Sequence, residues 1–97
     1  LAVDGIDAVF VGPSDFSIAL SNGAHVDPHN SAMLEAAQSV AAAAKKAGKF
    51  ACTLATTAAA GQRMRDLGFS LIALASDFAY MTAGANTILE AARKPTA

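Results

Sequence analysis

Residues 6–17 read IDAVFVGPSDFS, a short apolar run that ends at a Gly-Pro turn. A run of this kind, bounded by turn residues, is typical of a strand buried in a parallel sheet. Similar runs recur at residues 50–54 (FACTL) and 69–75 (FSLIALA), and a segment with helical periodicity follows each of the three. The sequence therefore predicts an α/β chain built from three strand-then-helix units.

Capping residues mark where the three predicted helices begin. In the first of them, apolar residues recur at spacings of three and four over residues 33–44. Gly48, directly after the end of that helix, is a stop signal. The start signals are Asp27-Pro28 and Asn30-Ser31 for the first helix, Thr56-Thr57 for the second and Ser76-Asp77 for the third.

The last predicted helix, residues 78–93, carries a broad apolar stripe. One interpretation is that this stripe turns inward and covers the sheet of its own chain. Its members are Phe78, Met81, Ala85, Ile88, Leu89 and Ala92.

Composition limits the class of protein. The 97 residues suffice for one small domain, and a net charge of −1 argues against a nucleic-acid binder, which carries a basic stripe. The single cysteine, Cys52, excludes a disulfide framework, favours a cytoplasmic protein and is expected to be a buried thiol. No apolar run approaches the roughly 18 residues of a membrane span, so no membrane partner is expected. Alanine supplies 25 residues and charged residues only 15%, which indicates a surface buried against something else.

Three parallel strands with helices on one side leave the other face of the sheet bare, whereas parallel sheets are normally covered on both faces. The same three units would make three-eighths of a (β/α)8 barrel, whose usual length is about 250 residues. We therefore expect residues 1–97 to be a partial TIM-barrel domain, a fragment of a barrel. Ligands of such folds bind at the carboxyl ends of the strands, which here are followed by residues 12–15, 54–57 and 75–77.

Asp15 follows the first strand behind the Gly12-Pro13 turn, and two interpretations of it stay open. A carboxylate at this place suits a hard divalent cation such as Mg²⁺ or Mn²⁺, while the turn can present the backbone N–H groups of Ser14 and Asp15 to a substrate carboxylate. Alternatively, Asp15 caps a short helical turn that begins at Phe16.

The segment Gly12-Pro13-Ser14-Asp15-Phe16-Ser17, preceded by Asp-Ala-Val-Phe-Val, resembles the strand-six motif of the HpcH/HpaI aldolase family. The resemblance continues through Ala47-Gly48-Lys49, Leu67-Gly68-Phe69 and Ala75-Ser76-Asp77, so it extends over essentially the whole chain. Members of this family are metal-dependent class II aldolases of pyruvate, such as 4-hydroxy-2-oxoheptanedioate aldolase and 2-dehydro-3-deoxyglucarate aldolase. The resemblance implies the C-terminal three βα units of a (β/α)8 TIM barrel of the pyruvate/phosphoenolpyruvate type.

The resemblance also implies a site. Asp15 is expected to be one of two carboxylate ligands of a divalent metal, Mg²⁺ or Mn²⁺, with Co²⁺ as a further option. The backbone at Ser14 and Asp15 would hold the carboxylate of pyruvate, in a turn that Gly12 and Pro13 shape. Leu54 would line the apolar side of the substrate pocket.

The reaction that the resemblance implies is the cleavage of a 4-hydroxy-2-oxo acid to pyruvate and an aldehyde. In the family, the second metal carboxylate is a Glu on the preceding strand, and the base His and a substrate-binding Arg come from earlier βα units. This sequence has no segment that matches them, and Glu35 and Glu90 lie within predicted helices. The isolated chain is therefore expected to lack turnover.

Further polar residues have open roles. His25 and His29, in the loop after the first strand, are either solvated or act as a base or ligand, and no family motif maps onto them. Ser76 falls beside the implied pocket, and Asp77 either caps the last helix or lines that pocket. In related barrels the final helix is often exchanged between subunits, so residues 78–93 are implied to join a homo-oligomer.

Two alternatives to the aldolase remain. A citrate-lyase-β-like or malyl-CoA-lyase-like enzyme would share the barrel and the metal chemistry. The chain could instead be a non-catalytic α/β remnant that needs a partner to fold, which would be indifferent to Mg²⁺ or Mn²⁺.

Overall fold

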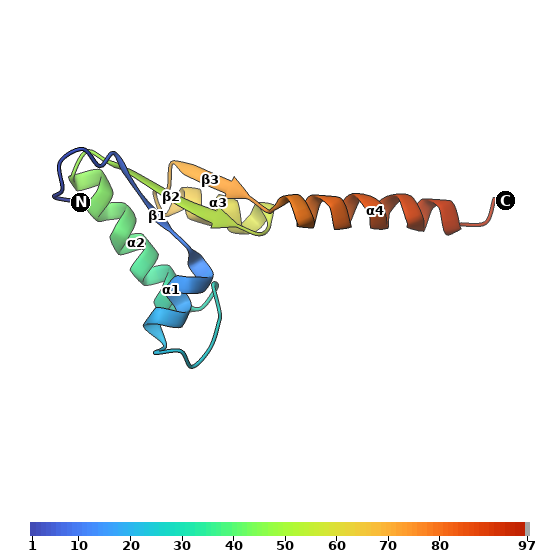
Figure 1. The fold of residues 1–97 in the computed structure, drawn as a ribbon, viewed down its shortest axis with the longest axis horizontal. Helices are drawn as coiled ribbons and strands as arrows, with labels where there is room; N and C mark the ends of the chain where they lie inside the picture. Colours follow the sequence, from blue (N-terminus) through green and yellow to red (C-terminus); the bar gives the residue numbers. More distant parts are fainter. Residues whose placement is uncertain (97) are drawn as a thin grey trace.

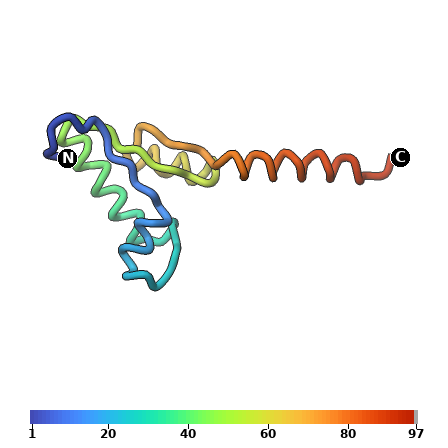
Figure 2. Tube along the Cα trace, viewed as in Figure 1, coloured from blue at the N-terminus to red at the C-terminus, as the bar shows by residue number. Residues whose placement is uncertain are grey.

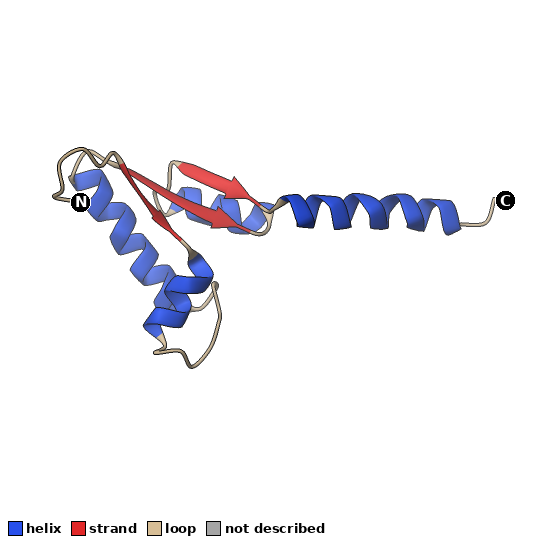
Figure 3. Ribbon diagram, in the orientation of Figure 1, coloured by secondary structure: helices blue, strands red, loops and turns tan. Residues whose placement is uncertain are grey.

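The structure, a computed structural model, describes residues 1–96. It contains three strands and four helices that alternate along the chain after the first pair of helices (Figures 1 and 3). The elements are β1 (Ala8–Val11), α1 (Pro13–Leu20), α2 (Ser31–Lys46), β2 (Phe50–Ala55), α3 (Ala58–Asp66), β3 (Leu71–Leu74) and α4 (Asp77–Arg93).

The strands form one parallel sheet in the order β1-β2-β3. Phe10 pairs with Cys52 and Cys52 pairs with Leu71, so the three strands run in register across the sheet. The prediction of three strand-then-helix units in a parallel sheet is confirmed. Because all strands run the same way, their carboxyl ends lie at one edge, where a ligand site is expected.

Side-chain caps confirm the predicted helix starts at Asn30-Ser31, Thr56-Thr57 and Ser76-Asp77, whereas no helix begins at Asp27-Pro28. The Asn30 carboxamide oxygen accepts from the Met33 N–H at 2.8 Å, and the hydroxyls of Thr57 and Ser76 do the same for the N–H groups three residues ahead. Asp77 is not the cap of α4 but its first residue, and its carboxylate accepts from the Phe78 N–H at 2.8 Å. Together these bonds satisfy N–H groups that a helix start leaves free.

Helix α1 corrects the sequence analysis, which expected a loop or a short turn from residue 16. The helix starts at Pro13, whose fixed φ and missing N–H suit the first helical position. Its eight residues show no clear apolar periodicity in the sequence, and in the structure only Pro13 and Ser17 are buried. A short helix of this kind gives almost no periodic signal.

The hydrophobic core lies between one face of the sheet and the helices α2 and α3. Alanines on α2 let that helix approach the strands closely, and Met33 and Met64 fill the space that remains. Thr53, on the helix-covered face of β2, is fully buried, and its hydroxyl donates to the Val11 carbonyl at 2.9 Å. The core residues are Val11, Met33, Ala37, Ala41, Ala44, Ala51, Met64 and Phe69.

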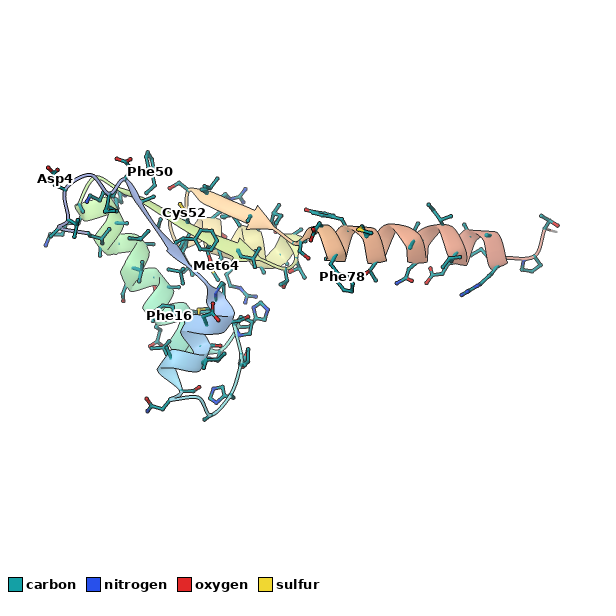
Figure 4. All side chains as sticks on the ribbon, in the orientation of Figure 1. Asp4, Phe16, Phe50, Cys52, Met64 and Phe78 are labelled. Carbon is teal, nitrogen blue, oxygen red and sulfur yellow. The ribbon has the colours of Figure 1, made fainter. Side chains whose placement is uncertain are left out.

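Among residues 1–96, no helix covers the opposite face of the sheet, as the sequence predicts. Phe10 remains 60% exposed and Phe50 62% exposed, and Figure 4 shows the Phe50 ring standing away from the helices. Cys52 lies on this same face in register between Phe10 and Leu71, and its thiol is free and buried, as predicted. A bare apolar sheet face of this kind suits the interior of a barrel.

Helix α4 projects from the rest of the molecule and buries none of its residues (Figures 1 and 2). The interpretation that its apolar stripe covers the sheet of its own chain is therefore wrong, since Phe78 is 75% exposed (Figure 4). The projection extends the molecule to 63 Å and raises the radius of gyration to 17.4 Å. A compact chain of about 100 residues has roughly 13 Å.

No helix within residues 1–96 combines the length and the apolar character that crossing a membrane requires.

Gly68 is required by the backbone. It ends α3 with φ +107°, and the Phe69 N–H closes the helix by donating to the Met64 carbonyl at 3.1 Å. We predict that Gly68→Ala lowers the free energy of unfolding by about 1–3 kcal/mol, because alanine is strained there. Gly84→Ala, inside α4 with open space around the position, is the control and should not lower it. Equal urea midpoints for the two variants would contradict this account.

The buried Thr53 hydroxyl gives a second prediction. Thr53→Val keeps the shape but removes the donor to the Val11 carbonyl, so we expect a loss of about 1–2 kcal/mol in the free energy of unfolding. Thr87→Val removes a similar bond, to the Ala83 carbonyl, on exposed α4 and should cost less than about 0.5 kcal/mol. Urea denaturation of both variants is the measurement, and a Thr53 effect as small as that of Thr87 would refute the role of this bond.

Candidate functional site

The site is built where β1 passes directly into α1. Val11 ends the strand, Gly12 is the N-cap and Pro13 is the first helical residue. The first hydrogen bond of α1 runs from the Phe16 N–H to the Gly12 carbonyl at 2.8 Å. The N–H groups of Ser14 and Asp15 precede this bond and have no partner inside the helix, so they form a positive helix end suited to a carboxylate.

Gly12 allows this turn to be tight. A Cβ at Gly12 would lie 3.2 Å from Asp15 Oδ2, closer than ordinary van der Waals contact. The absence of a side chain at Gly12 therefore lets the Asp15 carboxylate fold back over the start of α1.

Asp15 lies in the first turn of α1, and its carboxylate is exposed. It is not the N-cap, because Gly12 holds that position, so the capping interpretation is wrong. Within residues 1–96 no group donates a hydrogen bond to the Asp15 carboxylate, which leaves both oxygens available to a ligand. Asp15 shares a shallow hollow with Gly12, Phe10 and Phe16.

That hollow lies along the free edge of β1. In the described part of the chain, β1 pairs with β2 on one side only. Asp15 therefore faces the edge to which a further strand would add.

A second hollow lies beside the start of α1 at the carboxyl end of β2 and brings together three of the predicted substrate residues, Pro13, Ser14 and Leu54. Gly12 and Asp15 line the first hollow instead. The structure thus divides the predicted site between two neighbouring hollows on either side of the β1–α1 turn. The remaining residues of the second hollow are Pro28, His29, Ala55, Thr56, Ala60 and Met64.

A buried serine that sequence reasoning missed supports this turn. The Ser17 side chain is fully buried; its hydroxyl donates to the Ser14 carbonyl at 2.7 Å and accepts from the Asp27 N–H at 3.1 Å. It thereby ties the turn to the loop that leads into α2. The only signal in the sequence is a Ser three residues after Ser14, which a helix places one turn further on.

The two histidines differ in position. His29 lines the second hollow, whereas His25 lines a separate one near Ser21 and Leu20. Ser76 caps α4 at the end of β3 and lines neither hollow, and Asp77 likewise lies outside both. The polar residues that the structure adds to the predicted site are therefore His29 and Thr56.

The implied divalent metal can be tested against the donors present. Mg²⁺ takes one or two carboxylates together with waters and substrate oxygens. Asp15 meets one part of that requirement, with an exposed carboxylate and two available oxygens. Within residues 1–96, no three His, Cys, Asp or Glu side chains lie close enough to hold a metal together. The described residues therefore offer one candidate ligand and not a complete site.

Comparison with known proteins places this geometry in a family. The profile described as HpcH/HpaI aldolase/citrate lyase matches residues 1–83. The chain is 36% identical over 93 residues to a hydroxypyruvate/pyruvate aldolase of Paraburkholderia phytofirmans, covering 95% of this chain and 35% of the relative. It is 33% identical over 96 residues to a 5-keto-4-deoxy-D-glucarate aldolase of Klebsiella pneumoniae, covering 96% of this chain and 36% of the relative.

A solved structure agrees with the sequence relatives. The crystal structure of an HpcH/HpaI aldolase/citrate lyase family protein from Burkholderia cenocepacia matches 94% of this chain and 35% of its own, with a TM-score of 0.81 and 31% identity. The chain therefore spans about a third of the length of the proteins it matches. Because family profile, relatives and fold agree, the chain belongs to the HpcH/HpaI aldolase/citrate lyase family and has the fold of part of its barrel.

Proposed function

We propose that this chain supplies part of the active site of a divalent-metal-dependent class II aldolase, which cleaves 4-hydroxy-2-oxo acids to pyruvate and an aldehyde. The observation that carries the proposal is the start of α1. There an exposed Asp15 carboxylate and the free N–H groups of Ser14 and Asp15 lie together at the carboxyl edge of the sheet.

The start of α1 suits the carboxylate of pyruvate. Two backbone N–H groups and the positive end of the helix favour an anion. Beside them, Pro13 and Leu54 offer an apolar wall in the second hollow. A 2-oxo acid whose carboxylate meets the helix end would lay its carbon chain against this wall.

Asp15 is proposed as one ligand of Mg²⁺, Mn²⁺ or Co²⁺. A bound divalent cation polarises the keto oxygen of the substrate as a Lewis acid. Since Asp15 faces the free edge of β1, the second carboxylate is proposed to come from an element that adds to this edge. The base that takes the 4-hydroxyl proton and the Arg that binds substrate are likewise proposed to come from other parts of the barrel.

Aldolase is favoured over a citrate-lyase-β-like or malyl-CoA-lyase-like enzyme, because both relatives described above carry aldolase names. A homo-oligomer joined through α4 is part of the proposal, supported by the exposure of its apolar stripe. A cytoplasmic location is also part of it, supported by the free thiol of Cys52.

Asp15→Ala in the full-length protein that carries this chain tests the metal ligand. Loss of metal polarisation, worth several kcal/mol, should lower kcat/KM for pyruvate release about a thousandfold and weaken Mn²⁺ binding measured by calorimetry. Asp77→Ala removes a first-turn carboxylate from α4 instead and should leave both quantities nearly unchanged. Full turnover and unchanged Mn²⁺ affinity in Asp15→Ala would disprove the ligand role.

The isolated 97-residue chain gives a second test. We predict no pyruvate release from 4-hydroxy-2-oxo acids with Mg²⁺ or Mn²⁺ added, because one carboxylate alone does not build the site. The full-length protein, assayed in parallel, should release pyruvate only with the metal. Metal-dependent turnover by the isolated chain would overturn the division of the site proposed here. A full-length protein indifferent to metal would instead support the non-catalytic remnant.

A further inference from the structure

We propose that Ser17 is a positioning residue for the site, which orients the peptide group between Ser14 and Asp15 and holds the first turn of α1 in place. This inference rests on the proposed aldolase function and adds to it a residue that contacts neither substrate nor metal. It is carried by two hydrogen bonds of the fully buried Ser17 hydroxyl. The hydroxyl donates to the Ser14 carbonyl at 2.7 Å and accepts from the Asp27 N–H at 3.1 Å.

The first of these bonds acts on a group of the proposed site. The Ser14 carbonyl and the Asp15 N–H belong to one peptide unit, and a peptide unit is planar. A bond that fixes the direction of the carbonyl therefore fixes the direction of the N–H on its other side. Hydrogen bonds in such a chain also polarise one another, so the Asp15 N–H becomes a stronger donor. Ser17 thus aims one of the two N–H groups that are proposed to hold the substrate carboxylate.

The second bond joins α1 to the loop that follows it, which Figure 1 shows between α1 and α2. Helices shorter than about 12 residues are marginal by themselves in water, and of the eight residues of α1 only Pro13 and Ser17 are buried. Among residues 1–96, the bond from Asp27 to Ser17 is the one hydrogen bond that joins α1 to a residue more than five positions away. The place of this short helix therefore depends strongly on Ser17.

Asp27 is itself a firm anchor. Its carboxylate accepts from the His29 N–H at 3.0 Å, and its carbonyl accepts from the Asn30 side-chain amide at 2.7 Å. Asn30 also caps α2 by accepting from the N–H of Met33, whose side chain is fully buried in the core. Ser17 therefore connects the first turn of α1 to a loop that the core holds through α2.

Without the Ser17 hydroxyl, the Asp27 N–H loses its partner and the Ser14–Asp15 peptide loses one of its supports. The Asp15 carboxylate, in the same turn, is then free to shift together with the N–H groups. Active sites are sensitive to such movements, because a misplacement of about 1 Å can lower a rate about a hundredfold. The loss of this one hydroxyl should therefore affect both metal binding and substrate binding.

The test is Ser17→Ala in the full-length protein that carries this chain. We expect kcat/KM for pyruvate release from a 4-hydroxy-2-oxo acid to fall about 10- to 100-fold. The dissociation constant of Mn²⁺, measured by calorimetry, reports on Asp15, and the inhibition constant of pyruvate reports on the N–H groups. Each constant should rise about 3- to 10-fold, which corresponds to the loss of about one hydrogen bond.

Two further variants isolate the hydrogen bonds. Ser39→Ala is the matched control: the exposed Ser39 hydroxyl donates to the Glu35 carbonyl one turn back at 3.0 Å and has no second partner, so all three quantities should stay unchanged. Ser17→Cys keeps the side-chain volume but forms only weak hydrogen bonds, so it should be impaired as well. Wild-type values in Ser17→Cys would show that Ser17 only fills space and would overturn the proposal.

A purely structural role for Ser17 gives a different result. Partial unfolding of Ser17→Ala lowers kcat and the number of Mn²⁺ sites together, but leaves the affinities of the folded molecules for Mn²⁺ and pyruvate unchanged. That outcome overturns the positioning role while the aldolase stands. A wild-type protein that neither binds Mn²⁺ nor releases pyruvate overturns the proposed function instead, and the role of Ser17 falls with it.

Discussion

The parallel pairing of β1 with β2 brings Val11 beside Thr53, and the candidate site depends on this register. The Thr53 hydroxyl, fully buried, donates to the Val11 carbonyl and holds the last residue of β1 against the neighbouring strand. The next residue, Gly12, starts the turn into α1. A slip of one residue would move Val11 to the bare face and carry the start of α1 away from the end of β2.

The same register separates two chemical environments only a few residues apart. Toward β2, Pro13 and Ser14 meet Leu54 in a mostly apolar hollow. Toward the free edge of β1, Asp15 presents a carboxylate with no hydrogen-bond donor from the described residues. The substrate of the proposed function, with an anionic head and a carbon chain beside a cation, would use both environments. The β1–α1 turn supplies them because it stands at the boundary between the paired and the unpaired edge of one strand.

In the part of the chain that the structure describes, the sheet face that carries Phe10 and Phe50 stays bare, and so does the apolar stripe of α4. Both agree with the match to about a third of larger aldolases. Parallel sheets are seldom stable with one face in water, and exposed apolar stripes of this size favour association. The fold of the chain is thus easier to understand as part of a barrel than as a separate domain.

Local signals in the sequence were enough to locate most elements. The continuous apolar runs marked the strands, and Asn30, Thr57 and Ser76 marked the helix starts, because capping depends only on residues within one turn. Helix α1 was not predicted from the sequence, because its eight residues, of which two are buried, show no apolar periodicity. The projection of α4 away from the sheet was not predicted for a different reason. An apolar stripe shows that a helix packs against a partner, but it does not show which surface that partner provides.

The sequence by itself determined the parallel α/β class and the family resemblance, and it singled out residues 12–15 as the candidate site, because a strand end followed by Gly-Pro-Ser-Asp is a local pattern. Only the tertiary structure decided that Asp15 and Leu54 line different hollows, and that His29 and not His25 stands beside Ser14. Those outcomes depend on strand register and on the Ser17–Asp27 bond, which join residues ten or more positions apart. Apolar periodicity and helix caps depend on residues close together in the sequence, so they give no information about contacts at that separation.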